Sequence, residues 1–158
     1  MNPPVLYLDT SVMGGYFDSE WQEPTQELWR QWRAGRWRFR TSIVAAAEMA
    51  RAPEPVRELF RATFPPSELL ASNEESESLA RLYLDAGVLP RKCSDDARHV
   101  AACVAGGCLV LVSWNFRHLA NVRREAGFNA VNVLNGYGSL RIVSPLELIY
   151  EQEDAEEL

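Results

Sequence analysis

The chain has 158 residues, enough for one domain with a sizeable core, and its 47% hydrophobic and 24% charged content is typical of a globular protein that dissolves in water. Residues 1–4 lack the basic segment of a secretion signal, and no apolar run is long and uninterrupted enough to cross a bilayer. We therefore expect a cytoplasmic protein that makes no membrane contact.

The three cysteines contain no Cys-x-x-Cys pair, so we expect reduced thiols. His99 and Cys103 are four residues apart in an expected helix and could meet a soft metal ion on one helix face. Two ligands without a second pair make a poor zinc site. Buried thiols are therefore the preferred interpretation.

The charge of the chain permits a nucleic-acid partner without requiring one. The net charge is −6, but five acidic residues lie in positions 151–158, so the rest of the chain is close to neutral. Five arginines fall between Arg30 and Arg40 with no acidic residue among them. The planar guanidinium suits phosphate, and a solvated helix face accounts for the run equally well.

Three tryptophans of the same region, Trp29, Trp32 and Trp37, could stack on nucleic-acid bases. Their spacing follows the periods of a helix and a strand, which favours a place in the core or in an interface. We expect the second arrangement.

Hydrophobic periodicity and turn residues divide the chain into alternating strands and helices. We expect strands over residues 5–8, 36–40, 109–113 and 130–134. We expect helices over residues 11–17, 25–34, 42–51, 54–63, 74–86, 95–105, 116–126 and 144–150. The alternation predicts one α/β domain over residues 1–150, in which a mostly parallel central sheet is flanked by helices in three layers. The acidic tail, residues 151–158, is expected to be flexible.

Four polar residues stand where such a fold could use them. In open α/β sheets, ligands bind at the carboxyl ends of the strands, and both Asp9 and Asn115 follow an expected strand. Glu48 lies in a helix of small and apolar residues, and Asp96 lies in the first turn of another helix. Each has a plain structural alternative, because Asp9, Asp96 and Asn115 could cap helices and Glu48 could face solvent.

Together these residues belong to four motifs that resemble the PIN-domain family. The motifs are Asp9-Thr10-Ser11 after the first strand, Ser-x5-Glu ending at Glu48, Cys-Ser-Asp-Asp-Ala-Arg-His-Val from Cys93, and Leu-Val-Ser-Trp-Asn-Phe-Arg-His-Leu from Leu111. Their order and separations are most similar to the VapC-type toxins of bacterial toxin–antitoxin pairs. The resemblance extends from Leu6 to about Glu147.

The resemblance implies a PIN-like domain that cleaves RNA as an endoribonuclease dependent on Mg²⁺ or Mn²⁺. Asp9 and Asp96 would be direct or water-mediated metal ligands, and Glu48 would hold a water of the metal or a second ion. Many PIN domains carry an acid where this chain has Asn115, whose amide oxygen can ligate magnesium without adding charge. The number of metal ions, one or two, therefore stays open. The supporting residues would be Thr10 and Ser11, and the possible phosphate contacts would be Arg98, Arg117 and His118.

As a VapC-type toxin, the chain would have an RNA substrate, a cognate antitoxin protein and a second copy of itself as partners. The acidic tail could lie against the arginine run. The alternative is a catalytically weak or inactive PIN scaffold that binds RNA or a protein partner, and Asn115 is its best support.

Three other enzyme classes lack their required residues. An aspartyl phosphatase needs a second acid where Ser11 stands, and the Gly14-Gly15 pair comes too late for a dinucleotide-binding turn. The chain has no Gly-Lys-Ser/Thr for a P-loop ATPase.

Overall fold

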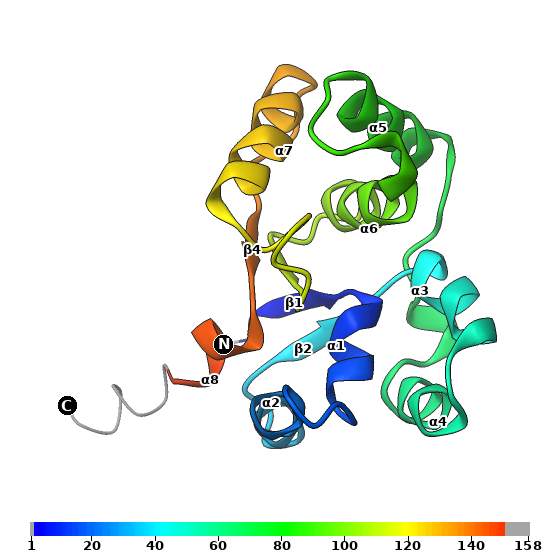
Figure 1. Cartoon of the computed structure of the whole chain (residues 1–158), viewed down its shortest axis with the longest axis vertical. Helices are drawn as coiled ribbons and strands as arrows, with labels where there is room; N and C mark the ends of the chain where they lie inside the picture. Colours follow the sequence, from blue (N-terminus) through cyan, green and yellow to red (C-terminus); the bar gives the residue numbers. More distant parts are fainter. Residues whose placement is uncertain (1, 151–158) are drawn as a thin grey trace.

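Four short strands form one all-parallel sheet in the order β2-β1-β3-β4 (Figure 1). The structure, a computed structural model, describes residues 2–150, so the predicted acidic tail lies outside the described residues. The strands are β1 (Val5–Leu8), β2 (Arg38–Arg40), β3 (Val110–Val112) and β4 (Arg141–Val143). The central strand β1 pairs with β2 on one side and with β3 on the other. The predicted α/β fold with a parallel sheet is confirmed.

Helices connect the strands and cover both faces of the sheet (Figure 1). The α-helices are α1 (Thr10–Gly15), α2 (Gln22–Arg33), α3 (Ile43–Glu48), α4 (Glu54–Thr63), α5 (Glu74–Asp85), α6 (Ser94–Ala105), α7 (Val122–Leu134) and α8 (Pro145–Ile149). Three short 3-10 helices add η1 (Met49–Arg51), η2 (Pro66–Glu68) and η3 (Arg91–Cys93). Within residues 2–150, none of the helices is long and apolar enough to cross a membrane.

The sheet separates two hydrophobic cores, because successive side chains of a strand point to opposite faces. Tyr7 and Leu111 pack with residues of α5, α6 and α7 in one core. Leu6, Leu8 and Val112 pack with residues of α1, α2 and α4 in the other. Strands buried on both faces read as apolar runs, which is why β1 and β3 were visible in the sequence.

The tryptophans of the arginine-rich region mostly fill the second core. Trp29 and Trp37 are buried, and Trp32 stacks in parallel on Phe39 with ring centroids 5.2 Å apart. This confirms the predicted core position for Trp29 and Trp37. Arg38, the fourth arginine of the run, lies at the amino end of the sheet, because it pairs with Val5 at the start of β1.

Two predictions for the last third of the chain are wrong. The predicted helix 116–126 is a series of turns up to Asn121, whose side chain accepts from the backbone N–H of Arg124 and caps α7. Gly127 does not end that helix but lies inside it, where a Cβ would approach Cγ1 of Val88 to 3.0 Å. The glycine permits close packing between α7 and the segment after α5.

The predicted strand 130–134 is the last part of α7, and the last strand is β4. Val131 is buried against the core, whereas Val133 and Leu134 are exposed, so packing along one helix face overrides the β propensity of this segment. The predicted helix 144–150 is present as α8, with Ser144 and Glu147 forming a capping box.

Candidate functional site

The four predicted catalytic residues come from four segments at the carboxyl end of the sheet. Asp9 directly follows β1, and Asn115 lies in the turn after β3. Asp96 is in the first turn of α6, and Glu48 is the last residue of α3. The parallel crossovers bring these segments together although they are far apart in the sequence. We call Asp9, Glu48 and Asp96 the acidic cluster.

Asp9 is a buried carboxylate held by two hydroxyl groups. The Ser11 hydroxyl donates to Oδ1 at 2.6 Å, and the Ser113 hydroxyl donates to Oδ2 at 2.5 Å. Each hydroxyl in turn accepts a backbone N–H at 2.9 Å, Ser11 from Trp114 and Ser113 from Asn115. The Asp9 side chain makes no capping bond to α1, so helix capping does not explain it.

The pKa of Asp9 reflects this burial. Desolvation raises it above the usual value of 3.8, and His99 together with the Ser11 and Ser113 hydroxyls lowers it part of the way back. Within residues 2–150, Asp9 has no basic side chain in salt-bridge contact. A buried carboxylate that lacks a counter-charge is costly unless a cation or a proton compensates it.

Glu48 is anchored by a buried chain of hydrogen bonds rather than turned to solvent. Its Oε1 is 2.5 Å from His99 Nε2, His99 Nδ1 is 2.8 Å from the Tyr7 hydroxyl, and that hydroxyl is 2.7 Å from Ser42 Oγ. Thr10 Oγ1 also lies 3.4 Å from His99 Nε2.

The raised pKa of Tyr7 indicates which atoms donate along this chain of hydrogen bonds. Burial raises the pKa of Tyr7 well above its usual value, so the phenol stays protonated and can donate to His99 Nδ1. His99 then donates from Nε2 to Glu48. Burial alone would raise the pKa of Glu48, but the hydrogen bond from His99, together with its other polar and charged neighbours, outweighs burial and lowers the pKa.

The pKa of Asp96 is raised by its burial and by the neighbouring acids. Desolvation and the charges of Asp9 and Glu48 raise its pKa from 3.8 to about 6, against a smaller lowering by His99. Its Oδ2 lies 3.4 Å from Asn115 Nδ2 and 4.0 Å from His118 Nδ1. The neighbouring acid Asp95 is exposed and pairs with Arg98, so the two residues have different environments.

Asn115 is the predicted residue whose role is most clearly structural. Its Oδ1 accepts the backbone N–H of His118 at 3.0 Å, and its backbone carbonyl accepts from Leu119 and Ala120. The side chain therefore closes the turn after β3 and offers its amide N–H to Asp96. The predicted capping role is present, although it caps a turn and not a helix.

The donor set suits a hard divalent cation that keeps part of its water shell. Three carboxylates lie at the carboxyl end of the sheet, and the pKa of Asp96 is raised by its burial first and then by the charges of Asp9 and Glu48. Within residues 2–150, the carboxylate oxygens of Asp9, Glu48 and Asp96 do not all lie within 4.8 Å of one another. Mg²⁺ usually keeps several waters and takes one or two carboxylates, which agrees with this spacing.

The predicted phosphate contacts differ in availability. Arg98 is engaged by Glu77 at 2.9 Å and by Asp95 at 3.5 Å. Arg117 is exposed, and the imidazole of His118 is 17% exposed. Partial burial lowers the pKa of His118, and nearby cations led by Arg117 lower it further, so the ring is neutral at pH 7.

A cleft of about 500 Å³ opens beside Glu48. Its charged lining residues are Arg51 and Arg98 together with Glu48 and Asp95, so the cleft carries both signs of charge. On the other side, Phe116 is exposed next to Asn115, and Trp21 packs against its ring with centroids 5.8 Å apart. The site therefore has a cleft of mixed charge beside Glu48 and an aromatic pair next to Asn115.

Several residues of the site were missed by the sequence analysis. Ser113 ends an apolar strand, and its hydroxyl at that position was the available signal. His99 was weighed only as a partner of Cys103, but it faces Tyr7 and Glu48, while the Cys103 thiol donates to the Cys108 carbonyl oxygen. The His99–Cys103 metal pair therefore does not form, and all three cysteines are buried free thiols as expected.

The comparisons with known proteins leave the site as the main source of information. No protein-family model matches the chain. No curated protein matches it either. The parallel α/β fold and the arrangement of the side chains are therefore the observations from which a function can be inferred.

The acidic cluster predicts a stability effect that needs no substrate. Because the folded pKa of Asp96 is about 6 and the usual value is 3.8, the folded state binds this proton more tightly than the unfolded state. Stability is therefore lost as the pH rises from about 4 to about 6. Asp96→Asn cannot ionise and should stabilise the metal-free protein above about pH 6.

The full shift corresponds to about 3 kcal/mol, and because 27% of the side chain is exposed we expect about 1–2 kcal/mol. Urea unfolding with chelator present, at about pH 4 and about pH 7.5, measures the difference between the variant and the wild type. A gain at neutral pH that disappears at acidic pH is expected. An equal effect at both pH values would contradict the raised pKa of Asp96.

Proposed function

We propose that the protein is a metal-dependent endoribonuclease of the PIN type that acts in the cytoplasm. The observation that carries the proposal is the acidic cluster, three carboxylates from separate segments with too little compensating positive charge. The motif resemblance described above points to the same three positions and to Asn115. The fold alone would not suffice, because many functions share parallel α/β sheets.

In this proposal each residue has a definite task. Asp9 and Asp96 hold the cation, and the Ser11 and Ser113 hydroxyls keep both oxygens of Asp9 oriented. His99 keeps Glu48 anionic and fixes its position. Asn115 closes the turn after β3 by accepting the backbone N–H of His118. When bound, Mg²⁺ or Mn²⁺ supplies a hydrolytic nucleophile at neutral pH and neutralises charge on the scissile phosphate.

The surroundings of the cluster support single-stranded RNA as the substrate. Arg51 borders the cleft beside Glu48 and can contact the phosphate backbone, whereas Arg98 would first have to leave its ion pairs with Glu77 and Asp95. The exposed ring of Phe116, next to Asn115 in the sequence, offers a face on which a base can stack. Arg117 and His118 lie in the same turn as Asn115 and add a second set of possible phosphate contacts.

The same proposal includes the partners of a VapC-type toxin. An antitoxin would cover exposed apolar residues at the site, such as Phe116, which is 43% exposed and follows Asn115. A homodimer is the expected assembly of the toxin. Size measurement of the purified chain, alone and coexpressed with a candidate antitoxin, tests both.

The experiment for the function is cleavage of a mixed pool of structured RNA by purified protein, with Mg²⁺, with Mn²⁺ and with chelator. We expect cleavage that stops with chelator, returns when the metal is restored, and leaves 5′-phosphate and 3′-hydroxyl ends. A preparation from cells that lack the chain controls for contaminating nucleases. Cleavage that is indifferent to chelator, or products with 2′,3′-cyclic phosphates, would refute the proposal.

A PIN-like scaffold that binds RNA or a protein without cutting is the second candidate. The observation in its favour is Asn115, which brings no charge and whose side chain is already used in the turn. This candidate predicts RNA binding with a strong salt dependence and no metal-dependent products. Metal titration separates the two, because the scaffold needs no affinity for Mn²⁺.

A further inference from the structure

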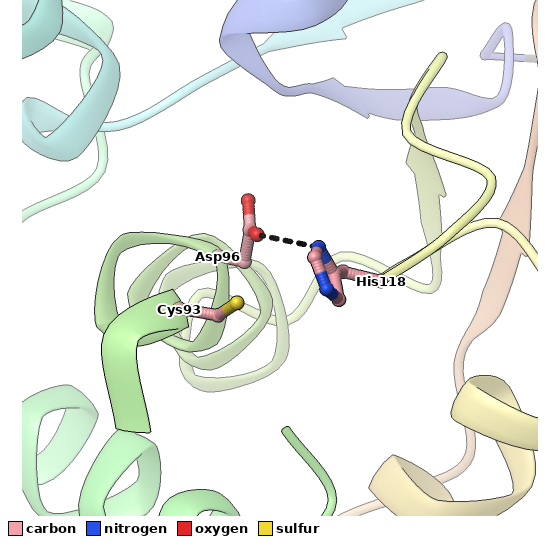
Figure 2. Close-up of side chains that lie close together, drawn as sticks. All are labelled: Cys93, Asp96 and His118. Atoms are coloured by element: carbon pink, nitrogen blue, oxygen red, sulfur yellow. Dashed lines mark ion pairs between the residues drawn. The ribbon is translucent and has the colours of Figure 1, made fainter. Parts of the chain in front are cut away.

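Another group of side chains, which shares only Asp96 with the acidic cluster, has the composition of a site for a thiophilic metal ion. The group consists of Cys93, Asp96 and His118, and one ligand atom from each lies within 4.8 Å of the other two (Figure 2). Figure 2 shows the thiol, the carboxylate and the imidazole gathered between the start of α6 and the turn after β3. We call these residues the Cys93 triad.

Two independently anchored segments supply the triad. Cys93 ends η3 and is the N-cap residue of α6, and Asp96 follows three positions later on the same side of the first turn. His118 comes from the turn that Asn115 closes through the backbone N–H of His118. The imidazole Nδ1 is 4.0 Å from Asp96 Oδ2, so the two segments already present their ligands to each other.

The distances suit a tetrahedral ion after small side-chain rotations. Zinc binds sulfur at about 2.3 Å and nitrogen or oxygen at about 2.0–2.2 Å, which places tetrahedral ligand atoms about 3.3–3.8 Å apart. Closing the triad from separations of up to 4.8 Å therefore shortens each distance by at most about 1–1.5 Å. The side chains of His118 and Asp96 are 17% and 27% exposed, so an ion can enter from solvent.

The ligand types separate this group from the acidic cluster. A thiolate with an imidazole and a carboxylate selects zinc and similar borderline-soft ions, whereas magnesium prefers oxygen ligands alone. Three protein ligands leave one tetrahedral position for water. Cys93 is a free thiol, so the sulfur is available for this role.

We propose that the Cys93 triad binds Zn²⁺ or a similar thiophilic divalent cation. Asp96 belongs to both the triad and the acidic cluster, so zinc at the triad withdraws a carboxylate from the magnesium ligands. Zinc is then an inhibitor of RNA cleavage. This consequence rests on the proposed function, whereas zinc binding does not.

The test uses the reduced, full-length protein, freed of metal with chelator and titrated with Co²⁺. Co²⁺ adopts the same tetrahedral coordination as Zn²⁺. A cobalt–thiolate bond gives a charge-transfer band in the near ultraviolet. We expect the band to saturate at one equivalent and to disappear when Zn²⁺ is added. Cys93→Ser should remove the band, and Cys108→Ser, which changes another buried free thiol, should keep it.

His118→Ala is the second variant and keeps the thiol in place. It should weaken cobalt affinity at least about 10-fold, since even residues outside the ligand shell change metal affinity about 10–100-fold. No band in the wild type, an unchanged band in Cys93→Ser, or unchanged affinity in His118→Ala would overturn the site. RNA plays no part in this readout, so a protein that binds cobalt through Cys93 but cuts no RNA would refute only the nuclease.

Discussion

Asp9→Asn and Asp96→Asn should each lower the rate of RNA cleavage at least about 10³-fold, which corresponds to about 4 kcal/mol of lost transition-state stabilisation. Each change removes one of the negative charges that would hold the cation, and each leaves a side chain of nearly the same shape. Single-turnover cleavage of one defined RNA with saturating Mn²⁺ measures the effect.

The matched control for this experiment is the neighbouring acid. Asp95→Asn changes a side chain that is 66% exposed and paired with Arg98, so its rate should stay within a few-fold of the wild type. If Asp95→Asn and Asp96→Asn lost activity equally, the assignment of the cluster would be wrong. Full activity in both Asp9→Asn and Asp96→Asn would exclude the cluster from catalysis.

Gly15→Ala should destabilise the protein by about 2–3 kcal/mol, because overpacking a close contact in a buried site costs about this much. A Cβ at position 15 would lie 2.6 Å from Nε1 of Trp114, an indole that is fixed by a hydrogen bond to Thr25. The melting temperature should fall by about 5–10 °C. Calorimetry of the metal-free protein measures it.

The adjacent glycine provides the comparison. Gly14 lies in the same helix α1, and a Cβ there would meet nothing within 4 Å. Gly14→Ala should therefore stabilise the protein by about 0.4–1 kcal/mol, through lower entropy of the unfolded chain. A similar loss of stability in both variants would show that the helix, and not the contact with Trp114, sets the requirement for glycine at position 15.

The two glycines also connect stability with the site. Trp114 donates its backbone N–H to Ser11, which orients Asp9, so a displaced Trp114 moves the support of the acidic cluster. We therefore expect Gly15→Ala to lose cleavage activity beyond what its unfolded fraction accounts for.

The parts of the fold visible in the sequence are those set by local patterns. The strand at Val5–Leu8 and the core of β3 are apolar throughout, and Pro53 and Gly87 end helices where expected. Asp9 could be identified because it directly follows such a strand. The position of Asp96 in the first turn of α6 followed from the same kind of local signal.

The parts that were missed depend on contacts between distant segments. Gly127 looks like a helix stop in the sequence, but its lack of a side chain serves the approach of Val88. His99 is indistinguishable from a core histidine until Tyr7 and Glu48 are seen on either side of it. Cys93 and His118 belong to separate motifs, and only the turn after β3 brings them together.

The pairing of Asp9 with Ser113 has a consequence for how the protein is made. The two residues are 104 positions apart, and their hydrogen bond forms only after β3 has joined the sheet. At about 5–20 residues per second, a ribosome needs about 5–20 s to add that stretch of chain. A nascent or truncated polypeptide that ends before β3 therefore carries Asp9 without the Ser113 hydroxyl that orients it, and the proposed nuclease activity would appear only after β3 has joined the sheet.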